Sequence, residues 1–196
     1  VQPTNKKHYR REITWEVFNE KANRFANMLT QNGIGKGKKV AILLMNCMEW
    51  LPIYFGALKA GALAVPLNYR YSSDEIKYCL DLADVRMLVF GPEFIERINV
   101  IQNDISNVDN FFFVGKREET PSYADNYADM TYFCSSITPP VEITDEEDAA
   151  IYFSSGTTGF PKAILHRHKA LVASCYTEQN HHSQTKDDCF LCIPPL

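Results

Sequence analysis

Charge of one sign, cysteine frameworks and long apolar runs are all scarce in this sequence. Its 196 residues carry 20 basic and 24 acidic side chains, a net charge of −4, and no block of like charge of the kind that binds DNA, RNA or anionic membranes. We therefore expect no nucleic-acid partner. The six cysteines are too sparse for a disulfide scaffold, which favours a reducing, cytoplasmic setting.

The longest apolar stretch, residues 50–67, is a poor candidate for a membrane span. It contains Pro52 and Lys59, and Gly61 interrupts it. A span needs about 20 predominantly apolar residues. A helix, a stop at Gly61 and a buried strand explain the stretch better, so no integral membrane segment is expected.

Apolar residues are nevertheless plentiful, at 45% of the chain with 12% aromatic, which is enough for a core. Short apolar segments alternate with helical ones, a pattern typical of a parallel sheet covered on both faces. The predicted fold is α/β, with parallel sheets sandwiched by helices. The expected strands are residues 39–45, 62–67, 86–90, 111–114, 149–153 and 190–193, and the expected helices begin near Thr14, Glu49, Ser72 and Phe94, with one more through Leu171 and Val172.

Two of these helices have clear boundary signals. Gly33 follows the first where a C-terminal cap belongs, and Ser72 with Glu75 makes a capping box at the start of another. Apolar residues recur at helical spacing in the first helix at Trp15, Phe18, Ala22, Phe25 and Leu29.

We divide the chain into three parts. Residues 1–115 form a first α/β wing, and residues 149–196 form a second segment in which the alternation resumes. Between them, residues 116–148 are roughly thirty residues rich in acid, Ser, Pro and Tyr, which predict a surface excursion.

One loop carries the chemistry. Residues 154–162 read SSGTTGFPK and directly follow an expected strand, at the end where open α/β sheets bind ligands. Two glycines let the backbone turn its N–H groups toward an anion, the hydroxyls add donors, and Lys162 supplies a positive charge for phosphate oxygens. A Walker A loop is excluded, because Pro161 and Ala163 stand where that motif needs Gly and Ser or Thr. The loop predicts a phosphate site.

In its wider context, YFSSGTTGFPKAILHRHKAL, this loop resembles the phosphate-loop signature of the adenylate-forming superfamily, which includes acyl-CoA synthetases, peptide-synthetase adenylation domains and luciferases. Upstream, TWEVFNEKANRFANML, KVAILLMNCMEWLPIYFGALKAGALAVPLNYRYSSDEI and RMLVF are similar to the amino-terminal part of AMP-forming acyl-CoA synthetases. The resemblance covers nearly the whole chain and is weakest over residues 116–148. It implies the amino-terminal part of the adenylate-forming, acetyl-CoA synthetase-like fold.

The resemblance also implies a two-step reaction with ATP, Mg²⁺ and coenzyme A. A carboxylate attacks the α-phosphorus to give an acyl-adenylate and pyrophosphate, and the thiol of coenzyme A then displaces AMP. By motif position the loop would hold the β- and γ-phosphates, and Lys162, the expected catalytic residue, would neutralise charge as pyrophosphate leaves. The phosphate-binding residues implied are Ser154, Ser155, Gly156, Thr157, Thr158, Gly159 and Lys162. The chain departs from the family at Ala163, where Gly is usual; Ala is free of strain there only if the backbone is extended.

Other reactive side chains are given plainer interpretations. His166 lies close behind the loop and is kept as a possible pocket-lining residue. No metal site is expected, because the four histidines in residues 166–182 lack a Cys or carboxylate at ligand spacing. Cys189 and Cys192 form a CxxC pair, but they flank an apolar run and are interpreted as buried strand cysteines.

The function expected is that of an AMP-forming acyl-CoA synthetase acting on a fatty or other hydrophobic carboxylic acid, with the acid, ATP and coenzyme A as small-molecule partners. Two alternatives stay open: an adenylation domain that loads a carrier protein, and a stand-alone phosphate- or nucleotide-binding module. The chain opens at Val1 without an initiator Met, and the adenine, ribose and adenylation-lysine elements that the resemblance implies would lie beyond Leu196. We expect an inactive piece of a longer cytoplasmic enzyme.

Overall fold

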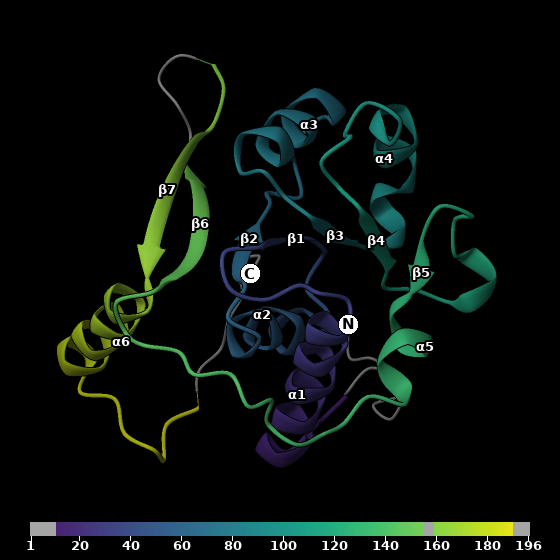
Figure 1. Ribbon diagram of the computed structural model, residues 1–196. Helices are drawn as coiled ribbons and strands as arrows, with labels where there is room; N and C mark the ends of the chain where they lie inside the picture. Colours follow the sequence, from purple (N-terminus) through teal and green to yellow (C-terminus); the bar gives the residue numbers. More distant parts are fainter. Residues whose placement is uncertain (1–10, 155–158, 190–196) are drawn as a thin grey trace, which may run out of the picture.

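One seven-stranded sheet organises the part of the chain that the computed structural model describes, residues 11–154 and 159–189 (Figure 1). The strand order is β5-β4-β3-β1-β2-β6-β7, and every neighbouring pair is parallel except β6 with β7. The strands are β1 (Lys39–Leu43), β2 (Leu63–Pro66), β3 (Met87–Phe90), β4 (Asn110–Phe113), β5 (Asp125–Asn126), β6 (Asp148–Ser154) and β7 (Lys162–Arg167). The predicted α/β fold with parallel strands between helices is confirmed.

Helices cover both faces of this sheet. On one face lie α1 (Trp15–Gln31), α2 (Trp50–Lys59) and α5 (Tyr127–Tyr132), and on the other lie α3 (Ser73–Leu82) and α4 (Ile95–Ile101). Helix α6 (His168–His182) follows β7. The remaining elements are two short 3₁₀ turns, η1 (Pro92–Phe94) and η2 (Arg117–Glu119). The central strand shows the two-sided burial directly. Val40 and Ile42 of β1 point into the core under α1 and α2, whereas Ala41 and Leu43 point into the core under α3 and α4.

The predicted helix boundaries agree with the structure. The hydroxyl oxygen of Thr14 accepts a hydrogen bond from the backbone N–H of Val17 at 3.2 Å, and Ser72 with Glu75 forms the expected capping box of α3. Trp15 differs from the prediction, because its side chain is 85% exposed. The buried positions of α1 begin only at Ala22, where the helix packs on the sheet, so its first turn projects beyond the core.

β7 runs against β6 because their connection is short. Seven residues separate Ser154 from Lys162, whereas a parallel return to the same sheet needs about a dozen or more. The chain therefore turns back as a hairpin, and β7 becomes an edge strand, with Ile164 and Leu165 exposed. The strand expected at residues 190–193 lies outside the described residues.

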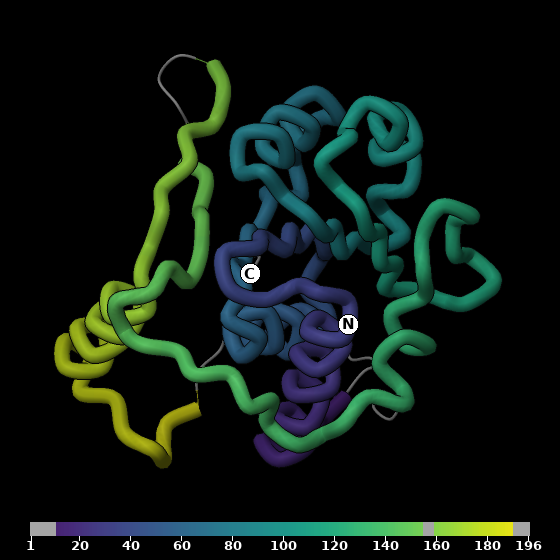
Figure 2. Tube along the Cα trace, in the orientation of Figure 1, coloured from purple at the N-terminus to yellow at the C-terminus, as the bar shows by residue number. Residues whose placement is uncertain are grey.

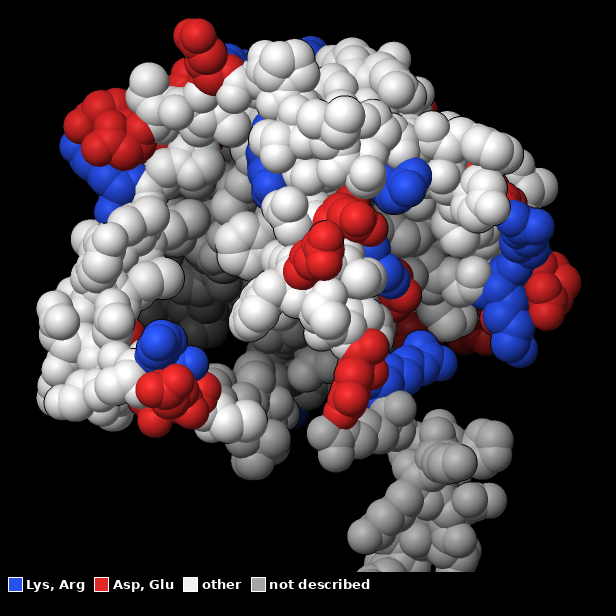
Figure 3. Space-filling model, turned by 90° about the horizontal axis from the view of Figure 1, so that it is seen from below, with Lys and Arg blue, Asp and Glu red and all other residues white. Residues whose placement is uncertain are grey.

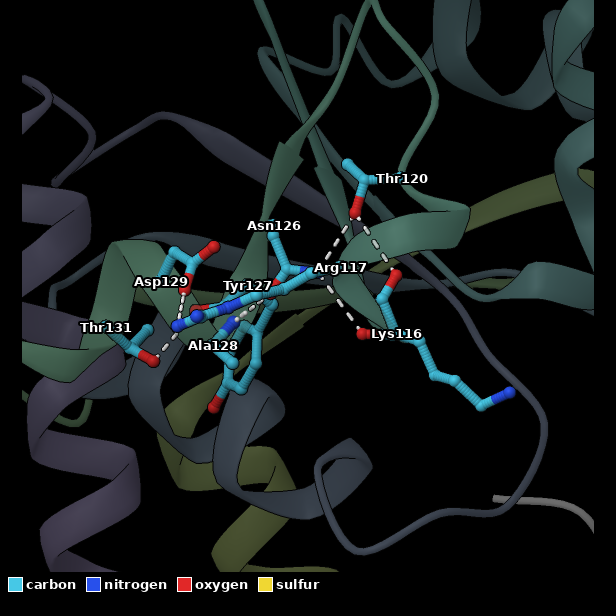
Figure 4. A network of polar contacts seen from close by, with 9 residues as sticks. Lys116, Arg117, Thr120, Asn126, Tyr127, Ala128, Asp129 and Thr131 are labelled. Carbon is cyan, nitrogen blue, oxygen red and sulfur yellow. Dashed lines mark hydrogen bonds and ion pairs between the residues drawn. The ribbon is translucent and has the colours of Figure 1, made fainter.

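The segment that the sequence predicts as a surface excursion, residues 116–148, contains the 3₁₀ turn η2, the edge strand β5 and the helix α5. β5 adds a parallel edge strand next to β4, and Tyr127 of α5 packs its ring 5.8 Å from that of Phe25 in α1. A buried side chain, Asn126, holds this region together (Figure 4). Its amide Nδ2 donates to the carbonyl of Gly115 at 3.2 Å and to Thr120 Oγ1 at 3.0 Å, and its Oδ1 accepts from Ala128 N at 3.0 Å.

The rest of this segment runs past α1, from the β5 edge of the sheet to the opposite edge, where β6 lies (Figure 2). Side-chain amides of α1 hold its backbone: Asn23 Nδ2 donates to Ser136 O at 2.7 Å, and Asn27 Nδ2 donates to the carbonyls of Ser135 and Ile137 at 2.8 Å. This return brings the chain to β6, which pairs with β2. Within the described ranges, no helix is both long and apolar enough to cross a membrane.

Candidate phosphate-binding site

The predicted phosphate loop connects β6 and β7 at the carboxyl end of β6 (Figure 1). The antiparallel register places Ser154, the last residue of β6, opposite Lys162, the first residue of β7. The two ends of the loop are therefore held side by side by the hairpin. Four of the predicted phosphate ligands, Ser155, Gly156, Thr157 and Thr158, lie outside the described residues.

The hairpin register also decides which side chains share a face. Cross-strand partners in an antiparallel pair point to the same side, and so do residues two apart along a strand. Tyr152 lies opposite Ile164, and His166 lies opposite Ala150, in the same register that pairs Ser154 with Lys162. Ser154, Lys162 and His166 are thus on one face of the hairpin, with Tyr152 between them.

The described end of the loop, residues 159–163, combines a positive-φ glycine with the first residues of β7. Gly159 has φ +101°, and a Cβ built there would meet no atom within 4 Å, so the glycine is required by backbone conformation and not by space. Pro161 is buried and Lys162 is exposed. Ala163 lies within β7, opposite Phe153, and has no positive φ. Its replacement of the usual family glycine is therefore free of backbone strain.

The loop also touches the helix layer on the other face of the sheet. The ring of Phe160 lies 4.7 Å from that of Tyr78 in α3, at an interplanar angle of 37°. The side chain of Phe160 is 49% exposed, so this contact covers about half of it.

The sequence analysis did not identify a pair of tyrosines beside the loop, Tyr152 in β6 and Tyr54 in α2. The hydroxyl oxygens of Tyr152 and Tyr54, which is in α2, are 2.7 Å apart and share a hydrogen bond. Burial, together with this hydrogen bond, raises the pKa of Tyr54 above its ordinary value. His166 contacts the same group, with its ring 5.3 Å from that of Tyr152 and nearly perpendicular to it. The spacing of Tyr152 to Ser154 could have placed both on one face, but its partner lies 98 residues away and left no sequence signal.

Beside this pair lies a cavity of about 430 Å³ at the carboxyl ends of β1 and β2. Its lining is largely apolar and aromatic: Leu44, Trp50, Pro66, Leu67, Asn68, Tyr69, Arg70 and Tyr152. Arg70 is held within its own loop, since Nε donates to Tyr69 Oη at 2.9 Å and the backbone N–H donates to Asn68 Oδ1 at 2.9 Å. Tyr152, two residues before Ser154, is the lining residue that β6 contributes.

A second cavity, of about 540 Å³, lies between the loops that follow β1, β3 and β4. Its charged lining residues are of both signs, Arg11, Glu49, Glu93 and Lys116. The surface as seen in Figure 3 shows the same mixture, with Lys and Arg interspersed among Asp and Glu. Leu44 lines both cavities, which places them on the same edge of the sheet.

Neither histidines nor cysteines assemble into a metal site within the described ranges, where no group of three or more His, Cys, Asp or Glu side chains could hold an ion. Cys189 is exposed and belongs to no strand, which corrects the expectation of a buried strand cysteine. Cys192 lies outside the described residues.

Comparison with known proteins finds relatives over most of the chain. The sequence profile of the family described as "AMP-binding enzyme" matches residues 2–196. The chain is 31% identical, over 160 residues, to the long-chain-fatty-acid–CoA ligase FadD13 of Mycobacterium tuberculosis strain CDC 1551, covering 81% of this chain and 30% of that protein. It is 30% identical, over 188 residues, to the crotonobetaine/carnitine–CoA ligase of Salmonella typhimurium strain LT2, covering 94% of this chain and 36% of that one.

A solved structure shows the same fold. The crystal structure of the anthranilate CoA ligase AuaEII in complex with anthranoyl-AMP superimposes with a TM-score of 0.80 at 27% identity, covering 85% of this chain and 32% of that one. The chain thus spans about a third of the length of the relatives that it matches.

Proposed function

Because this chain belongs to the family of AMP-binding enzymes, we propose that it is the phosphate-binding part of a longer ligase that activates a carboxylic acid with ATP and transfers the acyl group to coenzyme A. One structural observation carries the proposal. The loop SSGTTGFPK is closed by Ser154 and Lys162, which lie opposite each other on one face of a hairpin at the carboxyl end of a sheet strand.

In this proposal the loop holds the phosphates that leave. The hydroxyl of Ser154 donates to a phosphate oxygen, and the Lys162 ammonium balances the charge that develops as pyrophosphate departs from the α-phosphorus. Ser155, Gly156, Thr157, Thr158 and Gly159 add hydroxyl and backbone donors, by their positions in the motif. We assign Mg²⁺ to the substrate, entering with the phosphates of ATP.

The substrate and the acceptor are proposed from the named relatives. Those relatives are a fatty-acid, a crotonobetaine/carnitine and an anthranilate CoA ligase, and all three names specify coenzyme A as the acceptor. We propose a hydrophobic carboxylic acid as substrate and free coenzyme A as acceptor, in the cytoplasm. Loading of a carrier protein is the second candidate.

The division of the chain is also part of the proposal. Residues 1–115 form the first α/β wing, and residues 149–196 carry the phosphate loop, with the segment between them closing the far edge of the sheet. His166, which contacts Tyr152, is proposed to line the pocket behind the loop.

The test uses the complete protein that contains this chain. A panel of fatty, aromatic and amino acids is assayed for acid-dependent exchange of labelled pyrophosphate into ATP, and then for thioester formation with coenzyme A or with a carrier protein. We expect exchange and acyl-CoA formation with apolar acids, improving by up to about 0.8 kcal/mol for each buried methylene. Exchange confined to amino acids, or thioester formed only on a carrier, would support the second candidate.

A further inference from the structure

We propose that Tyr54 and Tyr78 hold the β6–β7 hairpin from its two faces and so set the position of the phosphate loop relative to the sheet. Tyr54 acts through Tyr152, and Tyr78 acts through Phe160. All four are positioning residues, and their role rests on the proposed function of the loop.

The hairpin needs such support because its pairing with the sheet is short. Between β2 and β6 the register pairs Ala64 with Ala150, four residues before Ser154, and β2 ends at Pro66. The outer part of the hairpin extends beyond the body of the sheet (Figure 1). Backbone hydrogen bonds to the sheet therefore cannot fix the loop, and side-chain contacts must do so.

The first contact lies near the loop end of β6, on the face of the hairpin that is turned toward α2. Tyr54 is 9% exposed, and its ring stacks on that of Trp50 at 5.6 Å, so its hydroxyl is presented from a rigid position. That hydroxyl meets the hydroxyl of Tyr152 at 2.7 Å. The ring of His166, on the neighbouring strand, packs against Tyr152 from the other side. The Tyr152 side chain is thus held between α2 and β7.

The second contact lies on the opposite face. Tyr78 belongs to α3, which starts at the Ser72 capping box. Two nearby residues of the same helix, Ile76 and Cys79, are fully buried and fix the helix on the sheet. Its ring meets that of Phe160 at 4.7 Å. Pro161 follows directly and stiffens the chain between this contact and β7.

Both contacts lie within two residues of an end of the loop, Tyr152 before it and Phe160 inside it. Tyr152 precedes Ser154 by two residues, and Phe160 precedes Lys162 by two. Each end of the loop therefore lies next to a residue that contacts a tyrosine: Tyr152 contacts Tyr54 on one face of the sheet, and Phe160 contacts Tyr78 on the other. A shift of either contact would change where the Ser154 hydroxyl and the Lys162 ammonium stand, and catalysis at phosphorus depends on such positioning.

The experiment measures steady-state exchange of pyrophosphate into ATP in the complete protein, for Tyr54→Phe, Tyr152→Phe, the double variant and Tyr78→Leu. Loss of one hydrogen bond or one ring contact is expected to raise the KM for ATP by about three- to tenfold. The KM for the carboxylic acid should stay within twofold. The Tyr54→Phe/Tyr152→Phe double variant should be no worse than either single variant, because each removes the same hydrogen bond.

Tyr123→Phe is the matched control. The Tyr123 hydroxyl is buried without a hydrogen-bond partner among the described residues, and its ring packs on Phe90 and Phe111 at the far wing of the sheet. Its removal should leave both KM values unchanged. A loss of folded protein lowers the apparent rate for every substrate without moving a KM, so the split between the two KM values separates positioning from instability.

Three results would overturn the inference: an unchanged KM for ATP in Tyr54→Phe and Tyr152→Phe, an equal rise in the KM values for ATP and acid, or additive effects in the double variant. A wild-type protein that shows no exchange with any acid would instead overturn the proposed function, so the two failures are distinguishable.

Discussion

Lys162 shows how position along a strand determines what a side chain can do. The residue begins β7, is exposed, and lies opposite Ser154, so its ammonium stands at the mouth of the loop. Ala163, one residue later, points to the other face and takes no part in that arrangement. An exposed lysine contributes little to packing, and its function at this site should therefore be separable from stability.

We predict that Lys162→Ala slows adenylate formation in the complete protein by about 10²- to 10³-fold, the ~2.7–4 kcal/mol typical of a preorganised donor to a developing charge. The melting temperature should barely change. Pyrophosphate exchange and thermal unfolding measure the two effects. Lys169→Ala, an exposed lysine of α6 that pairs with Glu146, is the control and should keep full exchange activity. Wild-type exchange with a lowered melting temperature in Lys162→Ala would make the residue structural.

At the scale of elements, the segment between residues 116 and 148 depends on polar contacts more than on burial. The Asn126 amide joins the turn before β5 to the start of α5 (Figure 4), and ion pairs tie the segment's end to the rest of the fold. Lys36 Nζ lies 2.6 Å from Glu147 Oε1, which fastens the beginning of β6 to the turn before β1. These contacts hold the path that delivers the chain to the phosphate hairpin.

Asn126→Ala is expected to destabilise the protein by about 1–3 kcal/mol, because it leaves the Gly115 carbonyl and the Ala128 N–H without their partner in a buried site. Urea unfolding followed by circular dichroism measures the change. Asn99→Ala, at an exposed position of α4, is the matched control and should be neutral or slightly stabilising. Equal effects of the two substitutions would show that the Asn126 network contributes nothing.

The Lys36–Glu147 pair should make part of the free energy of unfolding depend on pH. The hydrogen bond from Lys36, with a second from the Thr144 backbone N–H, lowers the pKa of Glu147 below its ordinary value of 4.5. A carboxylate with a lowered pKa in the folded state stabilises above its unfolded pKa, and this contribution is lost as the pH falls through the folded value. The free-energy difference between wild type and Lys36→Met should therefore be constant above about pH 5 and shrink below the lowered pKa. Unfolding curves from pH 3 to 7 would show it, and a difference that persists unchanged at pH 3 would contradict the prediction.

At the scale of the whole molecule, we propose that the chain supplies one wall of the site that binds ATP. It spans about a third of the relatives that it matches, and its phosphate loop lies on an edge hairpin with exposed apolar residues on β7 and α6. Phosphate contacts alone must compete with water and counter-ions.

We therefore predict that the 196-residue chain binds ATP no more tightly than about millimolar, worth ~4 kcal/mol, and forms no acyl-CoA. Isothermal titration calorimetry of the purified chain measures the affinity, and the complete protein serves as the positive control. A micromolar dissociation constant would instead favour the stand-alone nucleotide-binding module.

The local pattern of the sequence determined the elements and the motif. The capping box at Ser72, the apolar strands and the loop SSGTTGFPK are each specified by residues within a few positions of one another, because caps, strand burial and anion-binding turns are local properties. These features sufficed to predict the α/β fold and the phosphate-loop family.

Only the tertiary structure decided how those pieces meet. The Tyr54–Tyr152 hydrogen bond, the Phe160–Tyr78 contact and the entry of β5 into the sheet join residues that are distant in sequence, and such pairings depend on strand order and packing. The exposure of Trp15 has the same origin, since helical spacing marks a face but the length of the partner surface decides how much of that face is covered.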